Sequence, residues 1–165
     1  MLRMLGDDST SPGYGTVPSG PKRARVLLIS PQLRVHKVQL PRFQPSLGLG
    51  YMAAVLEQHG HAVQILDAAI EGRTTVIEEG EGLAIIGLTD TEIKARIAEF
   101  GPDVVGISSL FSSQAGRAFH IADLVKELDR SIVVVLGGIH ASEMYTKVME
   151  SQPSVDYILR GEGDF

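Results

Sequence analysis

The chain has 165 residues, of which 44% are hydrophobic, so it is long enough to form one domain with its own apolar core. Its 20 acidic and 15 basic residues give a net charge of −5 that is spread along the sequence, which argues against binding to nucleic acid or to an anionic membrane. The lack of cysteine excludes disulfides and thiolate metal sites, and no apolar run is long enough to span a bilayer, so we expect a cytoplasmic domain.

The first 22 residues differ in composition from the rest of the chain. Residues 1–22 repeat glycine and proline among serine, threonine and aspartate. This composition offers too little apolar surface to offset the entropy lost on ordering. We therefore expect a disordered leader over 1–22 and one domain over 23–165.

Five short apolar runs, rich in β-branched residues, predict buried strands. In chain order they cover 25–29, 62–66, 103–108, 132–136 and 157–159. Amphipathic helices are expected between them, beginning near 46, 90, 114 and 141. This alternation predicts an α/β, flavodoxin-like domain with a five-stranded parallel sheet in the order 2-1-3-4-5 and helices on both faces.

Three details refine the prediction between the main elements. The segment 31–45 is expected to be a long loop, and the segments 73–77 and 83–86 are expected to form a hairpin. Thr89 and Glu92 have the spacing of a capping box, in which each side chain accepts a hydrogen bond from a free backbone amide at the start of a helix.

The most informative feature of the sequence is the composition of the residues at the carboxyl end of each predicted strand. The first strand runs into Ser30, the third into 108–113, the fourth into Gly137-Gly138 and the fifth into 161–163. Parallel strands share their carboxyl edge, so these small and uncharged residues are expected to gather along one edge. Ligands of such sheets bind at that edge, where the strand order reverses between strands one and three. We expect a slot there for a large, mostly uncharged ligand.

A glycine motif supports an alternative function. Gly48-x-Gly50-x-x-Ala53 matches the dinucleotide fingerprint, and Asp67 stands near the place of the ribose-binding acid. The fingerprint belongs directly after strand one, whereas here 31–47 intervenes, so we favour the interpretation that these small residues let the helix pack closely on the sheet. A dinucleotide- or flavin-binding oxidoreductase domain and a non-catalytic ligand-sensing domain remain as alternatives.

Other catalytic and metal-binding patterns are missing. The Walker pattern is absent, and so are the paired acids of a receiver domain. His140, which comes directly after Gly137-Gly138-Ile139, is a candidate ligand contact, whereas His36, His59, His61 and His120 are expected to be solvated or structural. No nucleophile stands with a base, so we expect neither catalytic residues nor metal ligands in this chain.

Four segments resemble the N-terminal cobalamin-binding domain of B12-dependent radical SAM enzymes. They are PSLGLGYMAAVL at 45–56, PDVVGISS at 102–109, GGIHA at 137–141 and GEG at 161–163. The resemblance covers 25–165. Within that family the chain is most similar to methyltransferases of the fosfomycin-pathway type and to Mg-protoporphyrin ester cyclases.

The resemblance implies which residues contact cobalamin. A Ser-x-Leu after strand three and a Gly-Gly after strand four make room for the dimethylbenzimidazole tail in the B12-binding fold, and 108–110 and 137–138 match those positions. It also implies an aromatic wall at Phe111 and backbone contacts to corrin amides near 161–163. The cofactor-binding residues expected on this basis are Ser108, Ser109, Leu110, Phe111, Ser112, Gly137, Gly138, Ile139, His140, Gly161, Glu162 and Gly163.

Two motifs of related proteins are absent from this chain, and their absence bears on the expected function. The Asp-x-His-x-x-Gly motif, whose histidine ligates cobalt in other B12 domains, is absent, so the resemblance implies base-off, His-off methylcobalamin. The C-x-x-x-C-x-x-C motif is also absent, so a 4Fe-4S cluster and S-adenosylmethionine are expected only in a downstream radical SAM domain of the same parent chain. This chain alone is expected to be a non-catalytic cobalamin-binding module, and its parent a methyltransferase or cyclase.

Overall fold

The structure, a computed structural model, describes residues 23–38 and 41–161, and the predictions for 1–22 and for Glu162 and Gly163 lie outside them. The strands are β1 (Arg25–Ser30), β2 (Leu33–His36), β3 (Ala62–Asp67), β4 (Val76–Gly80), β5 (Leu83–Ile86), β6 (Val104–Ser108), β7 (Val133–Gly137) and β8 (Tyr157–Ile158). The helices are α1 (Leu47–Gln58), α2 (Ala68–Glu71), α3 (Asp90–Phe100), the 3-10 turn η1 (Ser112–Gln114), α4 (Ala115–Leu128), α5 (Ile139–Glu143) and α6 (Tyr145–Ser151). None of these helices combines the length and apolar character that crossing a bilayer requires.

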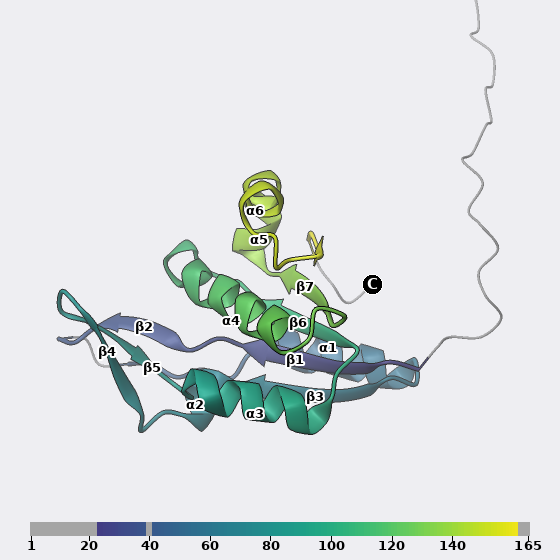
Figure 1. The fold of residues 1–165 in the computed structure, drawn as a ribbon, viewed down its shortest axis with the longest axis horizontal. Helices are drawn as coiled ribbons and strands as arrows, with labels where there is room; N and C mark the ends of the chain where they lie inside the picture. Colours follow the sequence, from purple (N-terminus) through teal and green to yellow (C-terminus); the bar gives the residue numbers. More distant parts are fainter. Residues whose placement is uncertain (1–22, 39–40, 162–165) are drawn as a thin grey trace, which may run out of the picture.

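The main sheet is parallel and has the order β3-β1-β6-β7-β8 (Figure 1). This is the predicted order 2-1-3-4-5, so the flavodoxin-like fold class is confirmed. Leu28 in β1 pairs with Ile65 of β3 on one side and with Gly106 of β6 on the other. The predicted strand limits agree with the observed ones to within one residue at each end.

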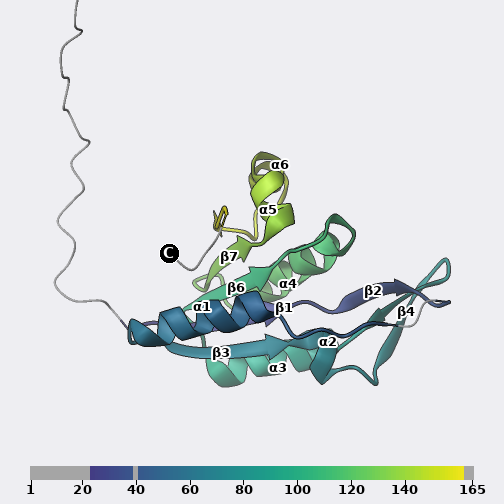
Figure 2. The ribbon, with the colours of Figure 1, turned by 180° about the vertical axis from the view of Figure 1, so that it is seen from behind.

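Helices cover both faces of this sheet. Successive residues of a strand point to opposite faces, and β1 shows the result. Leu27 and Ile29 join the larger core under α3 and α4, whereas Val26 and Leu28 pack with Leu49 of α1. Figure 2 shows α1 lying across β1 and β3 on the face opposite α3. The apolar strands are therefore buried on both sides, as a parallel sheet requires.

A second, antiparallel sheet in the order β2-β5-β4 lies beyond the carboxyl end of β1 (Figure 1). The predicted hairpin is confirmed, although its first strand lies at Val76–Gly80 rather than at 73–77. The prediction that 31–45 is entirely loop is wrong, because Leu33–His36 pairs with Leu83–Ile86. These four residues alternate between half-buried and exposed, the period of a strand with one covered face.

The helix ends show one confirmed and one wrong prediction. The capping box is present: the Thr89 hydroxyl accepts from the Glu92 backbone N–H at 3.3 Å, and the Glu92 carboxylate accepts from the Thr89 backbone N–H at 2.7 Å. The single helix expected over 141–151 is instead divided into α5 and α6. Met144 between them has φ −105° and ψ 17°, outside the helical basin, so the helix cannot continue through it.

Candidate functional site

The loops that follow β6 and β7 meet at the carboxyl edge of the main sheet. Ser108, the last residue of β6, pairs with Gly137, the last residue of β7. The segments 108–112 and 137–140 therefore lie next to each other, and we call these two segments the rim. The gathering expected from the sequence is present for these residues, whereas their binding to a cofactor stays a prediction.

Three hydrogen bonds tie the two segments of the rim together. The Ser109 backbone N–H donates to the Gly137 carbonyl at 2.7 Å, and the His140 N–H donates to the Ser109 carbonyl at 3.1 Å. The Ser112 hydroxyl lies 2.9 Å from Nδ1 of His140, whose ring also stands near that of Phe119, with 6.2 Å between the ring centroids. The rim is therefore a connected structure rather than two independent loops.

The two rim glycines are required for different reasons. Gly138 has φ 102° and ψ 173°, and a Cβ on it would lie 2.7 Å from the Ser109 carbonyl oxygen. It is needed because the backbone of Ser109 lies against it. A Cβ on Gly137 would meet nothing closer than Cβ of Leu159 at 3.8 Å. A methyl group would therefore fit at Gly137, in ordinary contact with Leu159, but not at Gly138.

Ser109 holds a polar group without a partner. The residue is 2% exposed, and its hydroxyl oxygen is buried without a hydrogen-bond partner. Leaving a buried hydroxyl unpaired costs about 1–3 kcal/mol.

The rim also carries three exposed apolar side chains and no acidic or basic residue. Leu110 is 45% exposed, Phe111 64% and Ile139 68%, although side chains of this kind are usually buried. Neither rim segment contains aspartate, glutamate, lysine or arginine. This combination favours a large ligand of low charge over a phosphate-rich one.

Gly161 is the only described residue of the predicted fifth-strand motif. It is exposed, has φ 78°, and its backbone N–H donates to the Ser142 hydroxyl of α5 at 3.1 Å. The segment after β8 is therefore attached to α5, whose first two residues belong to the rim.

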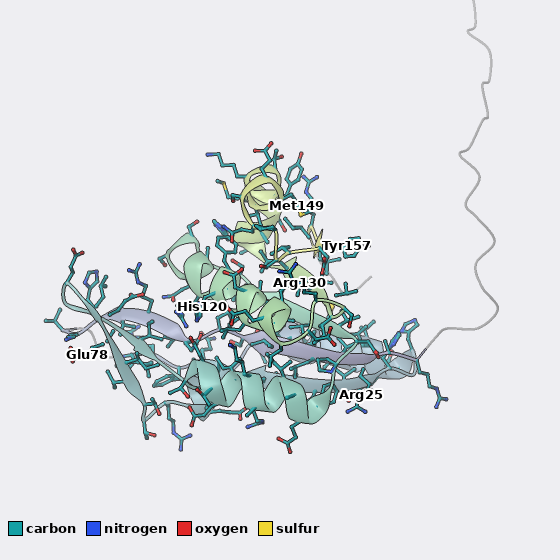
Figure 3. The ribbon with its side chains drawn as sticks, viewed as in Figure 1. Arg25, Glu78, His120, Arg130, Met149 and Tyr157 are labelled. Atoms are coloured by element: carbon teal, nitrogen blue, oxygen red, sulfur yellow. The ribbon has the colours of Figure 1, made fainter. Side chains whose placement is uncertain are left out.

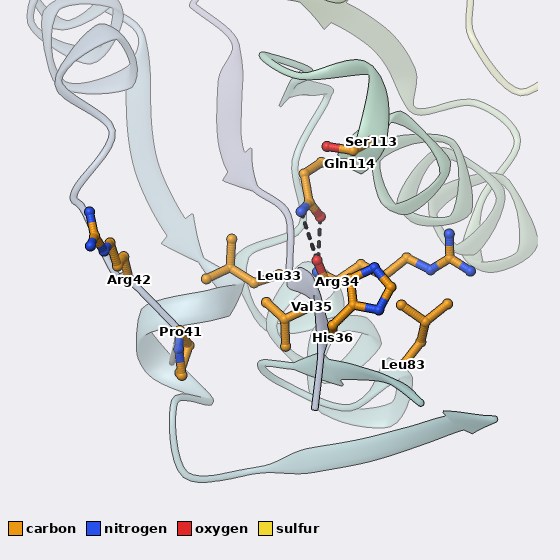
Figure 4. A pocket seen from close by; sticks show the side chains of 9 residues that line it. All are labelled: Leu33, Arg34, Val35, His36, Pro41, Arg42, Leu83, Ser113 and Gln114. Atoms are coloured by element: carbon orange, nitrogen blue, oxygen red, sulfur yellow. Dashed lines mark hydrogen bonds between the residues drawn. The ribbon is translucent and has the colours of Figure 1, made fainter. Parts of the chain in front are cut away.

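A pocket of about 390 Å³ lies beside the rim, between β2 and η1 (Figure 4). Its apolar lining consists of Leu33, Val35, Pro41 and Leu83. Its polar lining consists of Arg34, His36, Arg42, Ser113 and Gln114. A hollow of about 630 Å³ lies at the opposite edge of the sheet, between the ends of α3 and α4, and no predicted site residue lines it.

The histidines outside the rim fall into two groups. His120, on α4 (Figure 3), lies 2.8 Å from the Asp90 carboxylate. His59 and His61 contact the backbone of Val55 and Ala24, so all three have structural partners. His36 is exposed and lines the pocket. No group of three possible metal-ligating side chains occurs within 23–38 and 41–161.

The geometry does not suit the dinucleotide alternative. Gly48 and Gly50 are exposed within α1 instead of forming a turn directly after β1. The close-packing interpretation of these glycines is also wrong, because a Cβ on either would meet no atom within 4 Å. Burial raises the pKa of Asp67, whose carboxylate accepts from the Ile70 N–H and caps α2. The Asp67 carboxylate therefore has a structural role as a helix cap, which accounts for it without a bound ribose.

Sequence reasoning missed Gln114, which joins the rim to the second sheet. Its side-chain oxygen accepts from the Arg34 backbone N–H and its amide nitrogen donates to the Arg34 carbonyl, both at 2.9 Å. The alternation of apolar and polar residues over 33–36 was the signal that a strand lies there. Nothing in the sequence identified its partner.

Comparison with known proteins agrees with this geometry. The family model for the B12 binding domain matches residues 34–164. The chain is 38% identical over 149 residues to a cytidylyl-2-hydroxyethylphosphonate methyltransferase of Streptomyces wedmorensis, which covers 89% of this chain and 28% of that protein. It is 30% identical over 142 residues to an anaerobic magnesium-protoporphyrin IX monomethyl ester cyclase of Rubrivivax gelatinosus, covering 85% and 22% respectively.

A third relative is an uncharacterized methyltransferase of Pyrococcus horikoshii, 31% identical over 120 residues, which are 73% of this chain and 22% of that protein. The chain thus spans little more than a quarter of the length of these relatives at most. The family match covers most of the chain and both segments of the rim, and the relatives are of the two kinds that the motifs indicated. The chain therefore belongs to the B12 binding domain family.

Proposed function

We propose that the rim holds cobalamin at the carboxyl edge of the main sheet. The observation that carries this proposal is the contact between 108–112 and 137–140, which places exposed apolar side chains at a single edge where neither segment carries an acidic or basic residue. A corrin is broad, largely uncharged and edged with carboxamides. Its apolar surface suits Leu110, Phe111 and Ile139, and its nucleotide tail lies beside Gly137.

The cobalt is held base-off and without a histidine ligand. The segment between β1 and α1 lacks the Asp-x-His-x-x-Gly pattern, and its histidine, His36, lies on β2. The bound cofactor supplies a methyl group for transfer. The residues of this chain bind and orient the cofactor and exclude water from it.

The parent protein is a radical SAM methyltransferase or cyclase. Relatives bearing methyltransferase and cyclase names are several times longer than this chain, which leaves room for a domain that carries a 4Fe-4S cluster and S-adenosylmethionine. Within such a protein the chain described here acts as the cobalamin-binding module and contacts the radical SAM domain.

Cobalamin binding by the purified chain tests the proposal. Hydroxocobalamin or methylcobalamin is expected to co-elute with the chain and to change its corrin absorption spectrum. Phe111→Ala should weaken binding, whereas Met149→Ala, which removes an exposed apolar side chain from α6, should not. Lack of both co-elution and spectral change would contradict cobalamin binding, and a yellow protein or a nicotinamide-dependent thermal shift would favour the dinucleotide alternative.

The ligand state of cobalt has its own test. Nitrogen has a nuclear spin, so an axial histidine or benzimidazole nitrogen splits the electron paramagnetic resonance lines of cob(II)alamin. Bound cob(II)alamin is expected to lack this splitting. Splitting that disappears in His36→Ala would show that His36 ligates cobalt and that the His-off assignment is wrong.

A further inference from the structure

The pocket beside the rim owes its shape to strand β2. One edge of β2 pairs with β5 over Leu33–His36. The other edge is occupied at Arg34, where Gln114 bonds to the backbone N–H and to the carbonyl, both at 2.9 Å (Figure 4). The side-chain amide of Gln114 thus occupies the place that a neighbouring strand would take.

Gln114 connects this strand to the cofactor site. It ends η1, which begins at Ser112 of the rim, so the rim and the pocket share one short segment of chain. The Ser112 hydroxyl is in turn bonded to His140 in the other rim segment. A continuous set of contacts therefore runs from 137–140 through η1 to β2.

The lining of the pocket suits an uncharged polar group on an apolar stem. Leu33, Val35 and Leu83 supply apolar walls, and Ser113 and Gln114 supply hydroxyl and amide groups. Of the two arginines in the lining, Arg34 is paired with Glu79 and Arg42 is exposed to solvent. The acetamide and propionamide arms that edge a corrin have this chemistry, with methylenes ending in a group that both donates and accepts hydrogen bonds.

We propose that this pocket is a second compartment of the cofactor site, which receives a carboxamide arm of the corrin, and that Gln114 is the positioning residue that holds its wall. The inference rests on the proposed cobalamin binding. It assigns a role to the three-stranded sheet, which carries one wall of the pocket.

The test compares two ligands and three variants of the chain. Cobinamide lacks the nucleotide tail of cobalamin but keeps the carboxamide arms. If the pocket binds an arm, a substitution in it should therefore lower the affinity for both ligands equally. Gln114→Ala removes both bonds to Arg34, and Ser113→Leu fills the pocket from an exposed position. Each is expected to weaken cobalamin and cobinamide by about tenfold, as measured by spectral titration. The matched control Gln58→Ala, at an exposed position on α1, should bind as the unmodified chain does.

Gln114→Glu supplies a signature that simple loss of structure does not produce. The ionised carboxylate still accepts from the Arg34 N–H but repels the Arg34 carbonyl, so binding at neutral pH should be weak. A protonated carboxyl group both accepts and donates, as glutamine does. Acidification should therefore restore binding to Gln114→Glu toward that of the unmodified chain at the same pH, and should not restore it to Gln114→Ala.

The outcomes separate this inference from the proposed function. If the unmodified chain binds neither ligand, cobalamin binding itself is contradicted. If it binds both and Ser113→Leu and Gln114→Ala bind equally well, the pocket takes no part in binding and the inference is wrong. A loss confined to cobalamin would place the nucleotide tail in the pocket, which also overturns the assignment to a carboxamide arm.

Discussion

Gly138→Ala tests the rim geometry most directly. The backbone at Gly138 has φ 102° and ψ 173°, a region that residues with a Cβ almost never occupy, and holding alanine there costs about 1–3 kcal/mol. The added Cβ would also lie 2.7 Å from the oxygen and 2.9 Å from the carbon of the Ser109 carbonyl group. These are backbone atoms, so the loop must move.

Moving the loop breaks at least one of the bonds that hold it. Ser109 donates to the Gly137 carbonyl and accepts from the His140 N–H, and each such bond contributes about 1 kcal/mol. The free energy of unfolding should therefore fall by about 3 kcal/mol, a large part of the 5–15 kcal/mol typical of a domain. In urea the midpoint should fall by about 1.5 M with an unchanged slope. An unfolding midpoint equal to that of the unmodified chain would refute the contact between Gly138 and Ser109.

The neighbouring substitution Gly137→Ala is the matched control. Gly137 ends a strand in an ordinary conformation, and its added Cβ would be 3.8 Å from the nearest side chain, that of Leu159. Its unfolding free energy should change by no more than about 0.5 kcal/mol. Under the proposed function the same Cβ enters the space of the nucleotide tail, so cobalamin affinity should fall while cobinamide affinity does not. Unchanged affinity for cobalamin would mean that the tail lies elsewhere.

Two further predictions concern stability away from the rim. Thr89→Ala removes a capping-box bond to the Glu92 N–H and should lower the free energy of urea unfolding by about 1 kcal/mol, whereas the exposed Thr91→Ala should not; equal losses would contradict the cap. Burial opposes ionisation of Asp156, but the Lys126 ammonium and a backbone N–H of β7 outweigh it and hold its pKa below the usual range. The ionised Asp156 carboxylate therefore stabilises the fold above about pH 4, and this contribution to the free energy of unfolding is lost as the pH falls further. Asp156→Asn should lose less stability on acidification than the unmodified chain does. Identical pH profiles of urea unfolding for the two proteins would contradict this prediction.

The main sheet was predictable because its signals are local. A run such as Val26 to Ile29 can be buried on both sides only in the interior of a sheet, and alternating strands and helices leave few topologies. The capping box at Thr89 has both partners within one turn of helix. The gathering of Ser108 and Gly137 at one edge followed from parallel strands alone.

Strand β2 of the second sheet and the pocket were not predictable in this way, although the β4–β5 hairpin was. Strand β2 has four residues and depends on β5, about fifty residues later, and on Gln114, 80 residues after Arg34. No local pattern encodes such partners. The same is true of Gly138, for which the sequence suggested space for a ligand and the structure shows the backbone of Ser109.

The sequence by itself determined the fold class, the strand order and the edge at which a ligand is expected, because burial periodicity, helix caps and the handedness of crossovers act over short stretches of chain. The tertiary structure alone decided which rim atoms are in contact, which rim glycine would accept a methyl group, and that a pocket adjoins the rim. Those features arise where segments far apart in sequence meet, and their geometry depends on the packing of the whole domain.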